Sequence, residues 1–181
     1  MKDINLVNLP DLALNGIAEY LEPKDIIHLC DSSPCFADLR RFLPKYLDIK
    51  GEDFHKRGPD DGDFEPETYF DGPEMNQGAY SIKMNFQWKD LGWGNQRGQI
   101  WIQLMRNGKV LADTREDYFA LAPHMNRGDE LEDREVVIRG HPVVDLLERG
   151  DRLRFMRNVG GGGGHSLTVR QFKVQVELKK Y

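Results

Sequence analysis

The chain has 181 residues, of which 39% are hydrophobic and 30% are charged, and its formal net charge is −5. This length predicts one or two domains, and this composition is typical of a globular protein. No apolar run approaches the ~20 residues of a membrane-spanning helix, and the first residues lack the pattern of a secretory signal. Two cysteines, Cys30 and Cys35, make neither a disulfide framework nor a zinc site. We therefore expect the reducing environment of the cytoplasm or the nucleus.

Charge is distributed unevenly along the chain. Residues 58–74 carry seven acidic side chains and no basic one, whereas the part before them carries −2 and the part after them +4. A nucleic-acid-binding protein needs a concentrated basic face, which this distribution does not favour. We expect neither nucleic acid nor a membrane as a partner.

The first third of the sequence is expected to be helical. Apolar residues such as Ile17 and Leu21 fall at helical spacing. Pro23 starts a second segment, and the pair Ser33-Pro34 resembles an N-cap followed by proline in the first turn. Each of the three expected helices has only two or three turns, too few to persist alone, so they must pack on something.

A change of pattern follows. Residues 56–79 are rich in Gly, Pro and Asp, which predicts a linker, although Phe64, Tyr69 and Phe70 are expected to hold part of it against the next domain. From Tyr80 to Trp88, apolar and polar residues alternate as in a half-buried strand, which places Trp88 in the core.

Further strands are expected up to the end of the sequence. Asn107-Gly108 lies between two strand-like segments, a strong signal for a hairpin, and Trp101 in the first segment is another expected core residue. In the last strand the apolar residues change parity near Arg170-Gln171, which predicts a β-bulge. Six or more short strands without a long helix predict an antiparallel β-sandwich.

Residues 9–39 resemble the F-box motif in order and spacing. The matching residues are Leu9-Pro10, Leu14, Ile17, Tyr20-Leu21, Pro23, Asp25-Ile26, Leu29, Ser33, Phe36 and Leu39. The resemblance covers about residues 5–45. It implies an adaptor whose helices dock on a Skp-type linker protein and, through it, on a cullin–RING ubiquitin ligase. The residues expected at that interface are Leu9, Pro10, Leu14, Ile17, Leu21, Ile26 and Leu29. The alternative is that these residues pack on the β-domain of the same chain.

The expected fold class is therefore α+β, with a small N-terminal helical F-box, an acidic linker and a jelly-roll-like antiparallel β-sandwich. The corresponding ranges are 1–55 for the helical domain, 56–79 for the linker and 80–181 for the sandwich. The likeness of the sandwich to jelly rolls behind other F-boxes is architectural, and a fold alone does not establish a function.

Two loops of the expected sandwich are candidates for substrate binding. In residues 89–99, Trp93 lies between glycines and near Asn95, and an exposed indole can stack on a sugar or anchor a peptide. In residues 157–167, five glycines leave bare amides, with Arg157, Asn158 and His165 beside them. The alternatives are a Trp93 side chain that folds back on the sandwich and a simple hairpin loop.

No catalytic, metal or cofactor site is expected. The sequence has no zinc-protease, nucleophile-elbow or P-loop motif, and a strand rather than a helix follows the glycines. The acidic residues Asp129, Glu130, Glu132 and Asp133 lack the spacing of an EF-hand. The leading hypothesis is a non-enzymatic ligase adaptor that binds a protein substrate, in one version a glycosylated one. The alternative is a stand-alone intracellular lectin-like module that binds carbohydrate or peptide.

Overall fold

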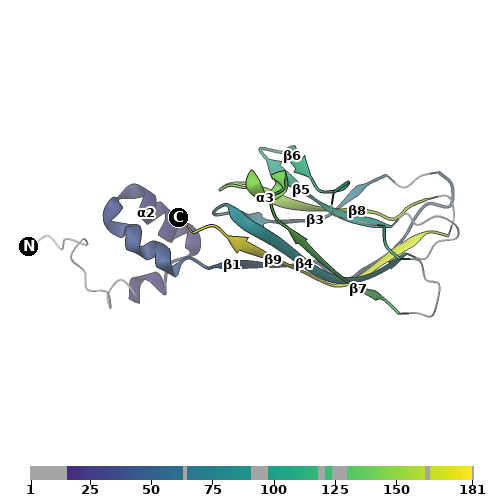
Figure 1. Cartoon of the computed structure of the whole chain (residues 1–181), viewed down its shortest axis with the longest axis horizontal. Helices are drawn as coiled ribbons and strands as arrows, with labels where there is room; N and C mark the ends of the chain where they lie inside the picture. Colours follow the sequence, from purple (N-terminus) through teal and green to yellow (C-terminus); the bar gives the residue numbers. More distant parts are fainter. Residues whose placement is uncertain are drawn as a thin grey trace, which may run out of the picture.

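A computed structural model describes residues 16–62, 65–90, 98–117, 121–123, 130–161 and 164–180. It shows two packed sheets with a small helical segment at one end (Figure 1). One sheet contains β1 (Tyr46–Lys50), β2 (Phe54–Arg57), β4 (Ala79–Asp90), β7 (Glu132–Ile138) and β9 (Ser166–Leu178). The other contains β3 (Glu67–Glu74), β5 (Gln99–Arg106), β6 (Lys109–Asp113) and β8 (Arg152–Asn158).

The strand order is that of a jelly roll. The first sheet has the order β1-β9-β4-β7, with β2 also on β9, and the second has the order β3-β8-β5-β6. All pairs are antiparallel. Strands β1 and β2 lie along the same long strand and act as one interrupted first strand. Counted so, the sheets have the orders 1-8-3-6 and 2-7-4-5, which are those of a double-sheet jelly roll.

Local sequence signals explain several elements. Strand β4 follows the expected alternation, and Trp88 and Trp101 are both buried, as predicted. Asn107 and Gly108 join β5 to β6 and have φ angles of 50° and 75°. Positive φ at both central residues is the requirement of a type I′ turn, so the predicted hairpin is confirmed.

The predicted β-bulge in the last strand is also confirmed. The pairing of β4 with β9 shifts register between Asn85 and Gln87, opposite residues 170–173. Gln171 has a φ of 53°, and its backbone N–H donates a hydrogen bond to Asp53 Oδ1 at 2.8 Å. The extra residue keeps Phe172 in the core and leaves Lys173 on the outer face, because a bulge changes which side chains point inward.

Aromatic rings fill the space between the sheets near this bulge. Phe172 lies within 5.2 to 5.8 Å, between ring centroids, of Phe86, Phe155, Phe70 and Tyr69. Phe70 stacks on Phe155 at 4.4 Å. Such contacts between rings stabilise a core beyond the simple burial of area. The prediction that Tyr69 and Phe70 hold their segment against the sandwich is thus confirmed, whereas Phe64 lies outside the described residues.

The predicted fold class is wrong for the N-terminal part of the chain, where a helical domain was expected. Strands make up 48% of the structure and helices 17%, so the chain is mainly a β-sandwich. Between residues 16 and 45 the structure describes α2 (Pro23–Ser32), the 3₁₀ helix η2 (Pro34–Phe42) and a helical turn at 16–18. We call residues 16–43 the helical cap. It does not form the expected helical F-box domain, because it buries few side chains and β1 begins at Tyr46, inside the predicted helical range.

The expected acidic linker is wrong as well. Strand β2 ends at Arg57, and β3 occupies Glu67–Glu74, in the middle of the range 56–79. The acidic residues of β3 pair with arginines of β8: Glu67 with Arg157, Asp71 with Arg154 and Glu74 with Arg152. Three of the seven acidic side chains that indicated a linker thus belong to a cross-strand ladder of ion pairs.

Candidate binding surfaces

The helical cap has a small apolar interior of its own. Its buried side chains are Ala18, Ile26, Cys30 and Leu39. Ile26 and Cys30 lie one turn apart on α2, as the helical spacing predicts. The Cys30 thiol donates to the carbonyl oxygen of Phe36 at 3.1 Å and so joins α2 to η2.

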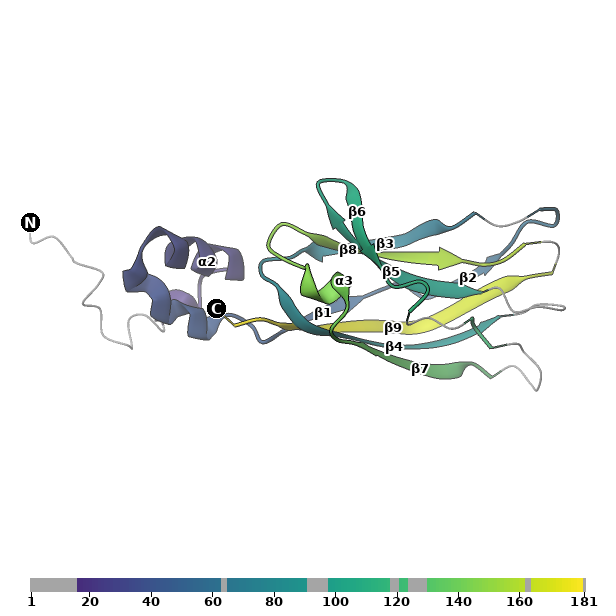
Figure 2. The ribbon, with the colours of Figure 1, turned by 45° about the horizontal axis from the view of Figure 1, so that its top comes forward.

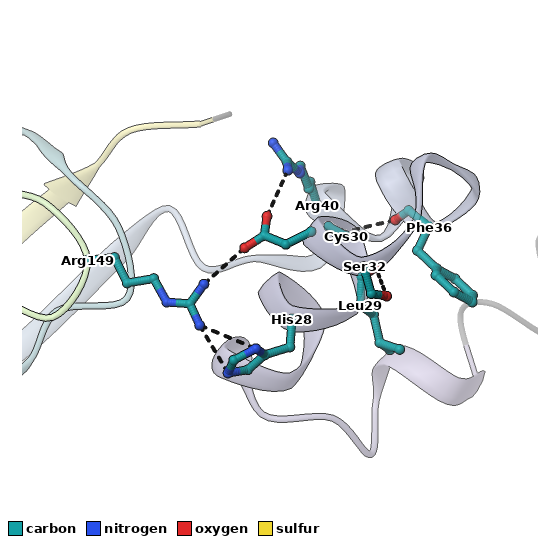
Figure 3. A network of polar contacts seen from close by, with 8 residues as sticks. His28, Leu29, Cys30, Ser32, Phe36, Arg40 and Arg149 are labelled. Atoms are coloured by element: carbon teal, nitrogen blue, oxygen red, sulfur yellow. Dashed lines mark hydrogen bonds and ion pairs between the residues drawn. The ribbon is translucent and has the colours of Figure 1, made fainter.

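Apolar and polar contacts attach the cap to the sandwich. The buried Ile27 lines a small hollow of about 120 Å³ between α2 and the sandwich, together with Leu47, Met75 and Leu178. Arg149, in the turn before β8, lies 2.9 Å from Asp31 Oδ2 and 3.0 Å from His28 Nε2 (Figure 3). Since a guanidinium only donates, the His28 ring nitrogen accepts. These contacts fix one side of α2 on the sandwich.

The structure divides the predicted docking residues into three groups. Leu9, Pro10 and Leu14 lie outside the described residues. Ile26 belongs to the cap interior, and Leu21 and Leu29 are half-buried against it. Ile17 is 39% exposed and belongs to neither apolar cluster.

Tyr20 is the most exposed large apolar side chain in the described part of the chain, at 90%. Sequence reasoning included it in the motif but not among the expected interface residues. An aromatic residue at the end of the expected first helix was the feature of the sequence that could have identified Tyr20. Ile17 and Tyr20 are therefore exposed side chains of the cap that belong to neither of the two described apolar clusters.

The ends of β4 and β8 and the start of β9, which border the two predicted substrate-binding loops, lie at the end of the sandwich opposite the cap (Figure 2). Trp93 and Asn95 lie outside the described residues. Arg157 pairs with Glu67 at 2.6 Å and lies 4.6 Å from the centre of the Phe54 ring. Asn158 Oδ1 accepts from the Gly160 backbone N–H at 2.8 Å. The side chains of Arg157 and Asn158 thus contact other residues of the sandwich.

His165 is buried beside a second buried group at this end. Its Nδ1 lies 3.9 Å from Oδ1 of Asp90, the last residue of β4. Asp90 Oδ2 accepts from the backbone N–H of Gly98 at 2.8 Å, and its own N–H donates to the Pro123 carbonyl. The structure therefore brings Arg157, Asn158 and His165 to one end of the sandwich, where Asp90 joins the bases of two loops.

Ion pairs cover the outer face of the β3–β8 pair. Burial alone would raise the pKa of Glu67, but hydrogen bonds from Lys56 and Arg157 outweigh it and hold this pKa below its usual value. The hydrogen bond from Arg154 lowers the pKa of Asp71. These carboxylates are ionised at neutral pH, and each is matched by a cation. On this face, charged side chains of one sign therefore lie beside side chains of the other, and Glu67 has both Lys56 and Arg157 as partners.

The outer face of the β1–β9–β4 layer is different. A hollow of about 460 Å³ lies over these strands and is lined by Asp48, Lys50, Lys83, Asn85, Lys173, Val174 and Gln175. A second hollow of about 320 Å³ continues toward β7 and shares Asn85 and Lys173 with the first. Sequence reasoning missed this surface, because its residues come from strands far apart in the chain. The alternating polar residues of β4 and β9 indicated that each strand has a polar outer face. The sequence did not show the register that brings these residues together.

Among the described residues, no three His, Cys, Asp or Glu side chains gather as a metal site would require. None of the helices in the described ranges has the length and hydropathy needed to cross a membrane.

No known family model matches this chain, and no curated protein matches it in sequence. The VP2 subviral particle of infectious bursal disease virus is similar in structure, with a TM-score of 0.47 and 12% identity over 75% of this chain. The match covers 33% of VP2, so this chain spans about a third of that protein. Eiger TNF from S. frugiperda gives a TM-score of 0.33 with 13% identity, over 59% of this chain and 62% of that one. The jelly-roll assignment stands on the strand order itself.

Proposed function

We propose that this chain is a non-enzymatic bridging protein, in which the helical cap recruits a partner protein and the sandwich holds a ligand. The observation that supports recruitment is the exposure of Ile17 and Tyr20 on the cap, at 39% and 90%. Aromatic and aliphatic side chains in such positions are typical of the centre of a protein interface. If the cap served only to cover the sandwich, these side chains would be expected to pack against it.

The sequence resemblance supports a particular partner. The F-box-like residues suggest a Skp-type linker protein, which would connect the chain to a cullin ubiquitin ligase. Ile17 and Tyr20 both belong to the motif that carries this resemblance. The proposed role of the chain is then to bring a sandwich-bound substrate close to the ligase, which raises its effective concentration there.

The test is a pull-down of the full chain with a purified Skp-type linker and cullin. Ile17→Asp and Tyr20→Ala should each weaken capture at least tenfold, because both remove exposed apolar contact area from the cap. Tyr80→Ala is the matched control, since Tyr80 is 56% exposed but lies on β4. Absence of capture by the unmodified chain, or equal capture by the cap variants, would count against the adaptor role.

A second candidate is the stand-alone binding module. It is favoured by the polar hollow on the outer face of β1, β9 and β4, which has a volume typical of ligand sites, ~300–1,000 Å³. In this version the cap is a structural element and the sandwich alone performs the function. The cap variants Ile17→Asp and Tyr20→Ala distinguish the two candidates, because they would leave ligand binding by a stand-alone module unchanged.

A further inference from the structure

Two lysines face each other on the outer surface of the first sheet. Lys50 of β1 pairs in register with Lys173 of β9, and both are exposed. Residues directly opposite in antiparallel strands have Cβ atoms ~4.5–5.5 Å apart, where like charges destabilise the pair. Lys173 also lies opposite Asn85 of β4. We call Lys50, Lys173 and Asn85 the lysine row.

No carboxylate neutralises the lysine pair within the described residues. Two acids line the hollows here: Glu135 pairs with Lys83 at 2.9 Å, whereas Asp48 accepts a hydrogen bond from the neutral amide of Gln175 at 3.1 Å. The second sheet shows the contrast, since each outward arginine of β8 faces an acid of β3. The fold thus keeps two adjacent cations unpaired on one sheet although it pairs them on the other.

The surroundings of the lysine row are polar and hollow. Amide side chains of Asn85 and Gln175 line the same hollow as the lysines, and each can both donate and accept hydrogen bonds. Val174 is the one apolar residue among the described residues that line it, and it is buried. The bulge at Gln171 leaves Lys173 on this face, in keeping with the frequent occurrence of bulges beside binding sites.

We infer that the lysine row binds an acidic saccharide, one that carries carboxylate or sulfate groups. The two cations match the acidic groups, and the amides match the hydroxyls. A peptide would instead need a free strand edge or an apolar groove, whereas this hollow lies over three paired strands. The inference names the ligand class for the sandwich half of the proposed function, on which it rests.

The experiment is a calorimetric titration of the full chain with a heparin-derived sulfated tetrasaccharide. Cellotetraose serves as the neutral counterpart and inorganic sulfate as the simple oxyanion. The sulfated tetrasaccharide should bind at least tenfold more tightly than either. Lys50→Gln and Lys173→Gln should each weaken its binding at least tenfold. Lys109→Gln is the matched control, because it removes one exposed lysine from β6 of the other sheet.

A second measurement separates binding from folding. Lys173→Glu should abolish binding and raise the melting temperature, because an ion pair with Lys50 would replace the repulsion. Absence of tetrasaccharide binding, equal binding of sulfate alone, or equal weakening by Lys109→Gln would overturn the inference. Ile17→Asp should leave saccharide binding intact, so failure of the adaptor role is distinguishable from failure at the lysine row.

Discussion

The sandwich and the helical cap obtain their stability in different ways. Among the described residues, twenty-six buried apolar side chains form the core of the sandwich, whereas four form that of the cap. The sandwich is held by pairing between strands far apart in the sequence, and the cap by contacts between residues close in the sequence. A segment with so small an interior depends on its neighbours for order. We therefore expect the cap to open more easily than the sandwich.

The largest expected effect tests the core of the sandwich. Phe172→Ala removes the ring that contacts four other aromatic rings between the sheets, and it should lower the free energy of unfolding by about 3–5 kcal/mol. Chemical denaturation measures this change, with Phe172→Leu as the milder control. A loss below about 1 kcal/mol would mean that the ring cluster is not central to the core.

A similar truncation in the cap should have a different signature. Leu39 is buried in the cap, and Leu39→Ala would cost ~2–5 kcal/mol if it acted on global stability. We expect local opening instead, with faster amide exchange in α2 and an almost unchanged melt of the sandwich. Hydrogen exchange followed residue by residue measures both. If Leu39→Ala lowered global stability as much as Phe172→Ala, the two regions would be one cooperative unit.

Acid should weaken the sandwich through its buried ion pairs. Burial alone would raise the pKa of Asp151, but hydrogen bonds from Arg106 and the Glu148 backbone lower it, as cations lower that of Glu67. A carboxyl with a lowered folded-state pKa stabilises the fold above its unfolded-state pKa. This stabilisation is lost as the pH falls through the folded-state value.

We therefore expect the melting temperature to fall as the pH decreases below about 4.5, the ordinary value for Glu. Asp151→Asn should melt lower than the unmodified chain at pH 7 and show a shallower fall in acid. Scanning calorimetry at several pH values measures both curves. Parallel curves would show that Asp151 does not contribute to the acid response.

The smallest effect concerns the contact between the two regions. Arg149→Ala removes the bonds to Asp31 and His28. Because these groups are partly exposed, the cost should be only ~0.2–1 kcal/mol. NMR shifts of α2 should change while those of the sandwich core do not. Arg152→Ala is the control, since its partner Glu74 lies within the sandwich. Shifts in α2 that follow Arg152→Ala equally would show that the cap is held by the sandwich as a whole.

The sequence predicts the elements that local patterns determine. Alternation revealed β4, Asn107-Gly108 revealed the hairpin, and the parity change revealed the bulge at Gln171. Strand β3 was missed because it is an edge strand with two register shifts, whose outward acids are stable only opposite the arginines of β8. Its composition alone is that of a loop.

The same limit applies to the candidate sites. The glycines indicated a loop at one end of the sandwich, and Arg157, Asn158 and His165 lie at that end, each beside a different residue. The lysine row could not be predicted, because Lys50 and Lys173 become neighbours only through the register of β1 on β9. The register between strands depends on how all strands of the sheet pair. It therefore cannot be derived from the pattern of one strand in the sequence.

The central position of β9 has a consequence for the time course of folding. This strand pairs with β1, β2 and β4, yet it comes after all three in the chain and is the last of the described strands: His55 contacts Thr168, 113 residues later. Until β9 leaves the ribosome, β1 and β2 lack their only partner among the described strands, and β4 exposes one edge. Unpaired edges of this kind favour association between chains and make folding slow. A nascent chain of this protein should therefore need protection by chaperones until β9 has been synthesised.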